Sequence, residues 1–439
     1  DRDLALVGCD HPKRSGMAQL LYARACVETT GALDSQSEDR SVRVSAVAAL
    51  TDKSPAAEDT QDVSHKSVLN VDRLSGSPYE MGLQHGKTHR DEIRTILRRY
   101  ADLAGSRWEK LFNLDDAVRQ PEVFFGPQEL EELRGIAKGA DVTEASVIAH
   151  NLRLFYDAEV GGVHFALSAE ASPETGLLHA ANEDLSKSVR LGDCLARSIQ
   201  VRRPDGTLPY VTFGVAGQVG SLSGINGCGL AISTATLADI PKESVSQQGR
   251  LHTLLVRQLL EQAKDIDSAV EIIHEFQTSA GGTWGLCISR EAEDRVCYVE
   301  WDGTNLKVQP AMPSIFAANH RLLMNFYETA RDLPSHSEHR LNRLKELLDG
   351  DRASHVSLSD VHDALRDRFD PSRGQEVSSP TINTIRRIDN QISVVMQPGK
   401  GQLWVTGGPM SNGHQNQFTK LDLHDLLPEL KSTATAADH

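Results

Sequence analysis

The chain has 439 residues and a formal net charge of −15, with 39% hydrophobic and 24% charged residues. That length is enough to bury a large core, and the composition is ordinary for a globular protein. The acidic charge and an aromatic content of 5% disfavour a nucleic-acid-binding surface. No apolar run approaches the roughly 20 residues that would span a bilayer, so we expect no membrane span.

The first 66 residues differ in character from the rest of the chain. Thr51 to Ser67 is rich in Ser, Asp, Glu, Lys and Thr without apolar periodicity, which is typical of a linker or exposed loop. We therefore expect residues 1–66 to be an N-terminal extension or the remnant of a preceding domain. Residues 67–430 are expected to form the main domain, and 431–439 a disordered tail. The chain starts at Asp1 without a methionine or a visible signal peptide. We expect a soluble protein with a truncated or processed N-terminus and of undetermined compartment.

From Val71 onward, helical and strand patterns follow one another in blocks. Apolar spacing predicts helices at Pro78–Leu103, Pro127–Ala140 and Thr143–Tyr156. Short strands bounded by turn residues are predicted at Val163–Ser168, Leu177–Asn182, Ser198–Arg202, Tyr210–Val215 and Gly229–Thr234. Helices at Arg250–Ala263 and Ile266–Phe276 precede strands at Gly285–Ser289, Arg295–Trp301 and Asn305–Val308. Helices at Arg340–Leu348 and Leu358–Arg366 and a hairpin of Gln391–Met396 with Gln402–Thr406 complete the series. This order indicates an α+β layered protein.

The cysteines give no sign of a metal site. The chain has six, at positions 9, 26, 194, 228, 287 and 297, and none forms a CxxC pair. Zinc sites built from cysteine usually need such pairs, so we expect no metal. We also expect no cofactor, and most of the cysteines are expected to be buried, reduced thiols.

Seven segments, taken in order, resemble the acyl-coenzyme A:isopenicillin N acyltransferase family. Its wider relatives include the bile-salt and penicillin V amidases. The segments are GSPYEMGLQHG (76–86), ELRGIAKGADVTEASVIAHN (132–151), HFALSAEASPETGLLHAANED (164–184), GSLSGINGCGLAIS (220–233), LHTLLVRQLLEQA (251–263), FAANH (316–320) and ISVVMQPGKGQLWVTGGP (392–409). Each is weak alone, but seven in the family's order are hard to obtain by chance.

The resemblance implies a four-layer αββα sandwich of the N-terminal-nucleophile (Ntn) hydrolase type, preceded by the N-terminal extension. It also implies a precursor that cuts itself before a cysteine, which then attacks amides or thioesters as the new N-terminal residue. This chemistry suits an N-terminal cysteine because its own α-amine titrates near pH 8 and can accept the thiol proton. Backbone and Asn amide donors stabilise the oxyanion, and a carboxylate near the amine fixes its position.

The position that resembles the family's nucleophile is Gly162. In the family the nucleophile precedes the aromatic residue of its strand by three positions, and here that aromatic is Phe165. Glycine has no side chain and can form no acyl-enzyme, so self-cleavage between Gly161 and Gly162 is not expected. The neighbouring Val163 and His164 carry no usable thiol or hydroxyl either.

Five further residues match positions of the family's site. Asp184, in Asn-x-Asp, resembles the catalytic aspartate, and Asn319 resembles the strand-end asparagine aimed at the reacting carbonyl. Asn182, His320 and Arg257 are predicted to contact substrate. Each also has a structural interpretation: Asp184 as a turn or cap carboxylate, the two asparagines as loop or backbone partners, His320 as a core imidazole and Arg257 as an internal salt bridge.

Three functional interpretations follow from these residues. The chain is a homologue of Ntn amide hydrolases and acyltransferases acting on linear amide bonds, left unprocessed and inactive by Gly162. Alternatively, it is an active-family enzyme in which a Cys→Gly mutation or sequence error replaced the nucleophile. A third interpretation is a non-catalytic scaffold that binds a small molecule or a protein. The expected partner is a small-molecule amide or acyl substrate, without nucleic acid, and homo-oligomerisation is left open.

Overall fold

The computed structural model describes residues 70–102, 114–156, 161–185, 197–239, 246, 248–324, 335–349, 355–406 and 417–430. The chain divides into two units, residues 1–68 and 69–439, and every described residue belongs to the second. The expected extension, residues 1–66, and the expected tail, 431–439, lie outside the described residues. No described helix is long and apolar enough to cross a membrane.

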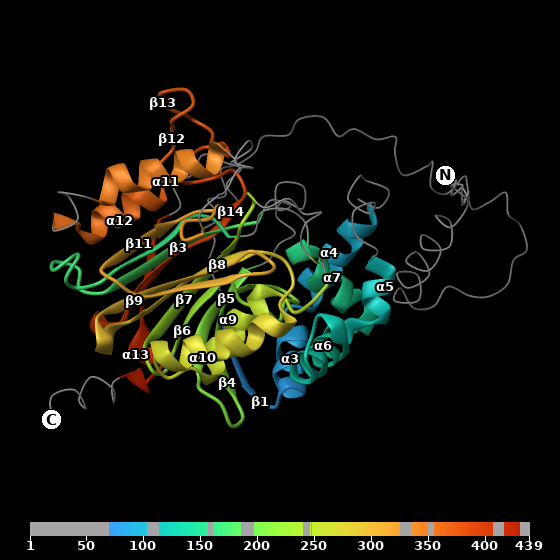
Figure 1. Cartoon of the computed structure of the whole chain (residues 1–439). Coiled ribbons are helices and arrows are strands. Elements are labelled where there is room, and N and C mark those ends of the chain that lie inside the picture. The colour runs from blue at the N-terminus through green and yellow to red at the C-terminus, as the bar shows by residue number, and fades with distance from the viewer. Residues whose placement is uncertain are drawn as a thin grey trace, which may run out of the picture. The chain divides into compact units, whose positions relative to one another are not determined.

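Two large sheets form the centre of the described unit (Figure 1). The eight-stranded sheet has the order β1 (Asn70–Gly76), β4 (Arg197–Pro204), β5 (Tyr210–Val215), β6 (Ser223–Asn226), β7 (Leu230–Thr236), β8 (Trp284–Arg290), β9 (Arg295–Trp301) and β10 (Leu306–Met312). The six-stranded sheet has the order β11 (Ser314–Ala317), β2 (His164–Leu167), β3 (Leu178–Asp184), β14 (Asn390–Gln397), β15 (Gln402–Val405) and β16 (Thr419–Asp422). β1 and β4 are parallel, and the other neighbouring strands are antiparallel. β12 (Phe369–Asp370) and β13 (Gln375–Glu376) form a small separate hairpin.

Helices cover the outer face of each sheet. α9 (His252–Gln262) and α10 (Ile266–Phe276) bury their apolar side chains on the eight-stranded sheet. α11 (Ser335–Leu348) and α12 (Leu358–Leu365) do the same on the six-stranded sheet. Apolar residues of both sheets pack between the layers, together with α13 (Leu423–Leu426). The fold is therefore the expected four-layer αββα sandwich (Figure 1).

A group of helices packs beside this sandwich (Figure 1). Its members are α3 (Pro78–Thr88), α4 (Arg90–Asp102), α5 (Leu114–Arg119), α6 (Pro127–Ala140) and α7 (Glu144–Tyr156). The prediction of a single helix at Pro78–Leu103 was wrong in one respect, because the structure has two helices here that are separated at His89. This residue has φ −108° and ψ 30°, and it ends α3 before α4 begins.

The first two family-like segments form a close helix pair. Two glycines of α3, Gly82 and Gly86, face two glycines of α6, Gly135 and Gly139. A β-carbon added at Gly82 would lie 2.1 Å from the Glu132 carbonyl oxygen, far inside van der Waals contact. The glycines therefore let the two backbones meet directly, which explains why these segments carry glycine at four-residue spacing.

Gly82→Ala tests this backbone contact. Alanine has the higher helix propensity and would gain about 1 kcal/mol in an isolated helix. In the folded chain the added carbon meets backbone atoms of α6, which cannot rotate away as a side chain can. We expect a net loss of about 2–3 kcal/mol in the free energy of unfolding, measured by urea denaturation. Lys87→Ala, on an exposed position of α3, is the control and should change stability by less than about 0.5 kcal/mol.

Candidate functional site

Three strands of the six-stranded sheet bring the predicted site together at one sheet end. Gly162 lies just before β2, Asp184 ends β3, and Asn319 follows β11. His164 is paired with Ala181 on one side and with Ala317 on the other, so the start of β2 lies beside the ends of β3 and β11. Residues distant in sequence therefore meet because antiparallel neighbours place one strand's start beside another's end.

Asp184 is fully buried among charged groups. Its Oδ1 accepts a hydrogen bond from Asn390 Nδ2 at 3.0 Å. Its Oδ2 lies 3.7 Å from Arg387 Nε and 3.8 Å from Arg340 Nη1, both too long for hydrogen bonds. Among the described residues, Oδ2 has no hydrogen-bond donor. Burial raises the pKa of Asp184 to about 7, opposed by the two guanidinium groups and reinforced by the Asp389 carboxylate.

Gly162 lies directly against this carboxylate. A β-carbon built on Gly162 would lie 2.2 Å from Asp184 Oδ2 and 2.9 Å from the Asn182 backbone oxygen. Ordinary contacts between such atoms are about 3.5 Å or longer. The space next to Gly162 is thus taken by Asp184, and a side chain here would have to displace the carboxylate. The preceding Gly161 has φ +74°, a conformation that favours glycine.

Asn319 places its amide against the Gly161–Gly162 peptide. Its Nδ2 donates to the Thr236 carbonyl oxygen at 3.0 Å and to the Gly161 carbonyl oxygen at 3.4 Å. Its Oδ1 accepts from Arg340 Nη2 at 3.1 Å. The amide is assigned this way round because only its nitrogen can donate to carbonyls. A side-chain donor therefore faces the carbonyl of the Gly161–Gly162 peptide bond.

Asn182 contributes its backbone to this region while its side chain points elsewhere. The side-chain nitrogen donates to the carbonyl oxygens of Leu365 and Ile385, both at 3.1 Å. The side-chain oxygen accepts from Ser393 Oγ at 2.6 Å. These bonds join β3 to the end of α12 and to β14. Contact between Asn182 and a substrate stays a prediction.

His320 and Arg257 occupy different surroundings. His320 follows Asn319, and its Nδ1 lies 2.8 Å from Ser337 Oγ, while burial lowers its pKa. Arg257 is buried in α9, where it pairs with Glu132 at 2.7 Å and Glu261 at 2.8 Å. Arg257 thus has the internal salt bridges that were its structural interpretation. A substrate contact for either residue stays a prediction.

Successive side chains of β3 point to opposite faces of the sheet, so its polar residues fall into two groups. Asn182 and Asp184 point toward the α11 and α12 side of the sheet, as their partners show. Glu183 points toward the other sheet, where Ser223 Oγ donates to it. Burial raises the pKa of Glu183 to about 8, so this carboxyl is protonated at neutral pH. The sequence patterns did not single out Glu183, although its place inside Asn-x-Asp on a strand implies the opposite face.

Three partners of Asp184 and Asn319 were not predicted. Arg387 and Asn390 lie in RRIDNQ, which runs into the start of β14, and this polar run at the beginning of a buried strand is a signal that could have indicated them. Arg340 comes from α11 and gave no such signal. An arginine in a predicted helix is usually solvent-exposed, yet this side chain is fully buried.

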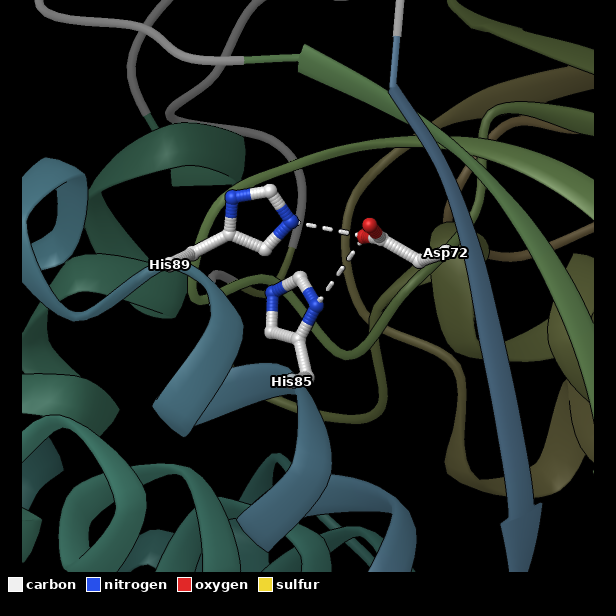
Figure 2. A group of neighbouring side chains, drawn as sticks. All are labelled: Asp72, His85 and His89. Carbon is white, nitrogen blue, oxygen red and sulfur yellow. Dashed lines mark hydrogen bonds and ion pairs between the residues drawn. The ribbon is translucent and has the colours of Figure 1, made fainter.

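A separate cluster of possible metal ligands lies at the junction of α3 and β1. Figure 2 shows the rings of His85 and His89 directed toward the Asp72 carboxylate. His89 Nε2 lies 2.7 Å and His85 Nδ1 3.7 Å from Asp72 Oδ2, and all three residues are buried. Among the described residues, this is the one group of three such side chains close enough to share an ion.

The hydrogen bonds of this cluster disagree with metal ligation. The Gly217 backbone N–H donates to His85 Nε2 at 2.8 Å, so Nε2 carries the lone pair. In a neutral imidazole the proton is then on Nδ1, the atom that faces Asp72. A metal bound to Nδ1 would need that proton moved to Nε2, directly against the Gly217 N–H. These atoms suit an arrangement in which imidazole N–H groups face the Asp72 carboxylate as donors. We therefore assign no metal to this cluster.

The four-layer αββα sandwich is the fold of the Ntn hydrolases. Residues 173–406 match the model of the family "Acyl-coenzyme A:6-aminopenicillanic acid acyl-transferase". This match covers more than half of the chain, and the chain therefore belongs to this family. The matched residues include Asp184 and Asn319, whereas Gly162 lies before them.

Solved structures that resemble this chain include proteins from three organisms. An N-acylethanolamine-hydrolyzing acid amidase ortholog of Caenorhabditis elegans has 15% identity and a TM-score of 0.38, with 54% of this chain and 93% of that chain covered. A mutant of the conjugated bile acid hydrolase of Clostridium perfringens has 13% identity, a TM-score of 0.39 and coverage of 60% and 93%. Penicillin V acylase of Agrobacterium tumefaciens has 13% identity, a TM-score of 0.33 and coverage of 63% and 83%. No match was found among curated protein sequences.

The pKa of Asp184 predicts how stability depends on pH. The folded chain keeps this proton up to about pH 7, whereas the unfolded chain releases it near 3.8. The stability that the neutral carboxyl contributes is therefore fully present below 3.8 and is lost as the pH rises through 7. The variant Asp184→Asn cannot titrate here. Its stability relative to the parent should rise between about pH 4 and 7, by up to about 4 kcal/mol.

Urea unfolding of both proteins across this pH range measures the difference. Glu183→Gln should show the same sign over a window that reaches about pH 8, because burial also raises this pKa. A stability difference for Asp184→Asn that stays constant with pH would contradict the raised pKa.

Proposed function

We propose that this chain is an Ntn amide hydrolase or acyltransferase that lost its nucleophile at Gly162 and persists as one uncleaved polypeptide. The family and the fold support the hydrolase or acyltransferase class. The lost nucleophile and the retained site around it are the new elements of the proposal. In its present form the chain would bind an amide or acyl compound without forming a covalent adduct.

The observation that carries the proposal is the Asp184 oxygen facing Gly162. A buried carboxylate oxygen without a hydrogen-bond donor is costly, and Oδ2 has none among the described residues. It is also the atom nearest to a β-carbon built at position 162. A carboxylate in this position suits the free α-amine that cleavage before residue 162 would create. The amine would give Oδ2 the charged donor that it lacks.

Asn319 supports the same proposal from the other side of the peptide. Its Nδ2 lies 3.4 Å from the Gly161 carbonyl oxygen, which would become the oxyanion during attack on this bond. A preorganised donor at that oxygen is the usual means of stabilising such a charge. Donor and carboxylate therefore flank the same peptide bond, and the missing component is the attacking side chain.

A scaffold without small-molecule binding is the second candidate. The burial of the site favours it, since Asp184 and Asn319 both have an exposed fraction of 0%. Under this interpretation Asp184 is a structural carboxylate that holds Arg340 and Arg387. The two candidates differ in what a thiol at position 162 would do.

The parent chain is expected to stay intact and unreactive. Without a thiol or hydroxyl at position 162, neither the N-to-S acyl shift nor acyl-enzyme formation can occur. Intact mass spectrometry after prolonged incubation should give a single species, and an electrophilic amide probe should leave the chain unlabelled. Fragments ending at Gly161 would contradict the proposal.

Gly162→Cys is expected to restore self-cleavage. The new β-carbon must move the Asp184 carboxylate, whose Oδ2 is the end of a side chain and can give way. The thiol would then attack the Gly161 carbonyl beside Asn319, forming a thioester while the C–N bond between residues 161 and 162 breaks and the amine takes up the thiol proton. Water would hydrolyse this thioester, which releases the Gly161 carboxylate and regenerates the thiol. Purified Gly162→Cys should divide between residues 161 and 162 into two fragments on a denaturing gel and should acquire label from the amide probe.

Gly162→Ala is the matched control because it adds the same β-carbon without a thiol. It should suffer the same steric cost, about 1–3 kcal/mol, and remain uncleaved. Both variants are compared by circular dichroism to show that they fold. A folded Gly162→Cys that stays intact and unlabelled would reject the proposal and favour the scaffold.

A further inference from the structure

We propose that Arg340 is a positioning residue of this site, whose guanidinium fixes the orientation of the Asn319 amide and links it to the Asp184 carboxylate. The inference rests on the proposed function, because it assigns Arg340 a role in the same site. It concerns a residue that neither touches the Gly161–Gly162 peptide in the described contacts nor was singled out by the sequence.

The guanidinium of Arg340 reaches two site residues at once. Its Nη2 donates to Asn319 Oδ1 at 3.1 Å, and its Nη1 lies 3.8 Å from Asp184 Oδ2. Its Nε donates to the His336 carbonyl oxygen at 3.2 Å, which anchors the plane of the group to α11. The side chain is fully buried. One rigid, planar cation therefore stands between the amide and the carboxylate.

This contact decides which way the Asn319 amide faces. With the amide reversed, its NH2 group would face the Arg340 NH2 group, and two donors would oppose each other. Its oxygen would then face the carbonyl oxygens of Thr236 and Gly161, which can only accept. Arg340 thus disfavours the reversed amide and keeps a donor directed at the Gly161 carbonyl.

The backbone of Asn319 is held independently of Arg340. Its N–H donates to Ser337 Oγ at 2.8 Å, and its carbonyl oxygen accepts from the Ala238 N–H at 2.9 Å. Loss of the guanidinium should therefore free the side-chain amide while the strand end stays in place. The positioning role is for this reason separable from folding.

Lysine is a poor substitute at this position. Its single ammonium group can face Asn319 Oδ1 or Asp184 Oδ2, but it has no planar fork to contact both. The other charged groups at Asp184 are Arg387 and Asp389, which remain in any Arg340 variant. Arg340→Lys keeps the local charge and loses the two-sided contact, whereas Arg340→Met loses both.

The test uses two measurements on the full chain. The first follows hydrogen exchange of the Asn319 side-chain amide by nitrogen-15 NMR in the parent, with Asn319→Ala identifying the signal. Arg340→Met and Arg340→Lys should both accelerate this exchange by about tenfold or more. The second measures self-cleavage of Gly162→Cys, which Arg340→Met should slow by about 100-fold, the typical effect of losing one oxyanion donor.

Arg343→Met is the matched control. Arg343 lies one turn further along α11 and pairs with Asp367 at 2.8 Å, away from Asn319 and Asp184 in its described contacts. It should leave both the amide exchange and the cleavage rate within about twofold of their references, although it removes an ion pair from the same helix.

The two measurements separate this inference from the proposed function. Unchanged amide exchange in a folded Arg340→Met would overturn the positioning role, as would undiminished cleavage in Gly162→Cys carrying the same change. If Gly162→Cys itself is not cleaved, the proposed function fails, while the exchange comparison in the parent still decides the role of Arg340. If Arg340→Met does not fold, the exchange rate of the Asn319 amide in Arg340→Lys tests the positioning role instead.

Discussion

The burial of the Asp184 carboxyl group is the constraint on which this end of the molecule depends. A carboxyl removed from water must be neutralised by a proton or surrounded by opposite charge. Here Arg340 comes from α11, Arg387 from the segment before β14, and Asn390 from the start of β14. These elements meet the end of β3 at one point, so the carboxyl joins a helix layer to the sheet. Its remaining oxygen is directed at position 162.

The glycine at position 162 and the location of the Asp184 carboxyl group depend on each other. A side chain at 162 would need the room that Asp184 Oδ2 occupies. Without that side chain, the carboxylate packs directly against the backbone at position 162. The Asn319 amide still faces the Gly161 carbonyl on the other side of the peptide. Under the proposed function, Asp184 and Asn319 are the partners of a covalent mechanism around a residue that cannot take part in one.

Much of the fold could be predicted because local patterns were strong. The helices at Pro127–Ala140 and Ile266–Phe276 and the strand at Tyr210–Val215 were predicted with the observed bounds. The short strands β6 and β11 were missed, because Ser-Gly-Ile-Asn and Ser-Ile-Phe-Ala are too short to show a period and depend on pairing with their neighbours. The break at His89 was missed for a related reason. The apolar spacing continues through His89. The residue that His89 contacts, Asp72 of β1, is distant from it in sequence, so no local pattern reveals the contact.

The sequence by itself determined the family-like segments, the layered fold class, the absence of a side chain at position 162 and the identity of Asp184 and Asn319. These are properties of residue order, and glycine lacks a nucleophile in any fold. Only the tertiary structure decided the surroundings of those residues. The strand order β11-β2-β3-β14 brings their sheet ends together, and α11 adds the buried Arg340. No local pattern carries that information, because the charge that Asp184 requires is supplied by segments more than 100 residues away.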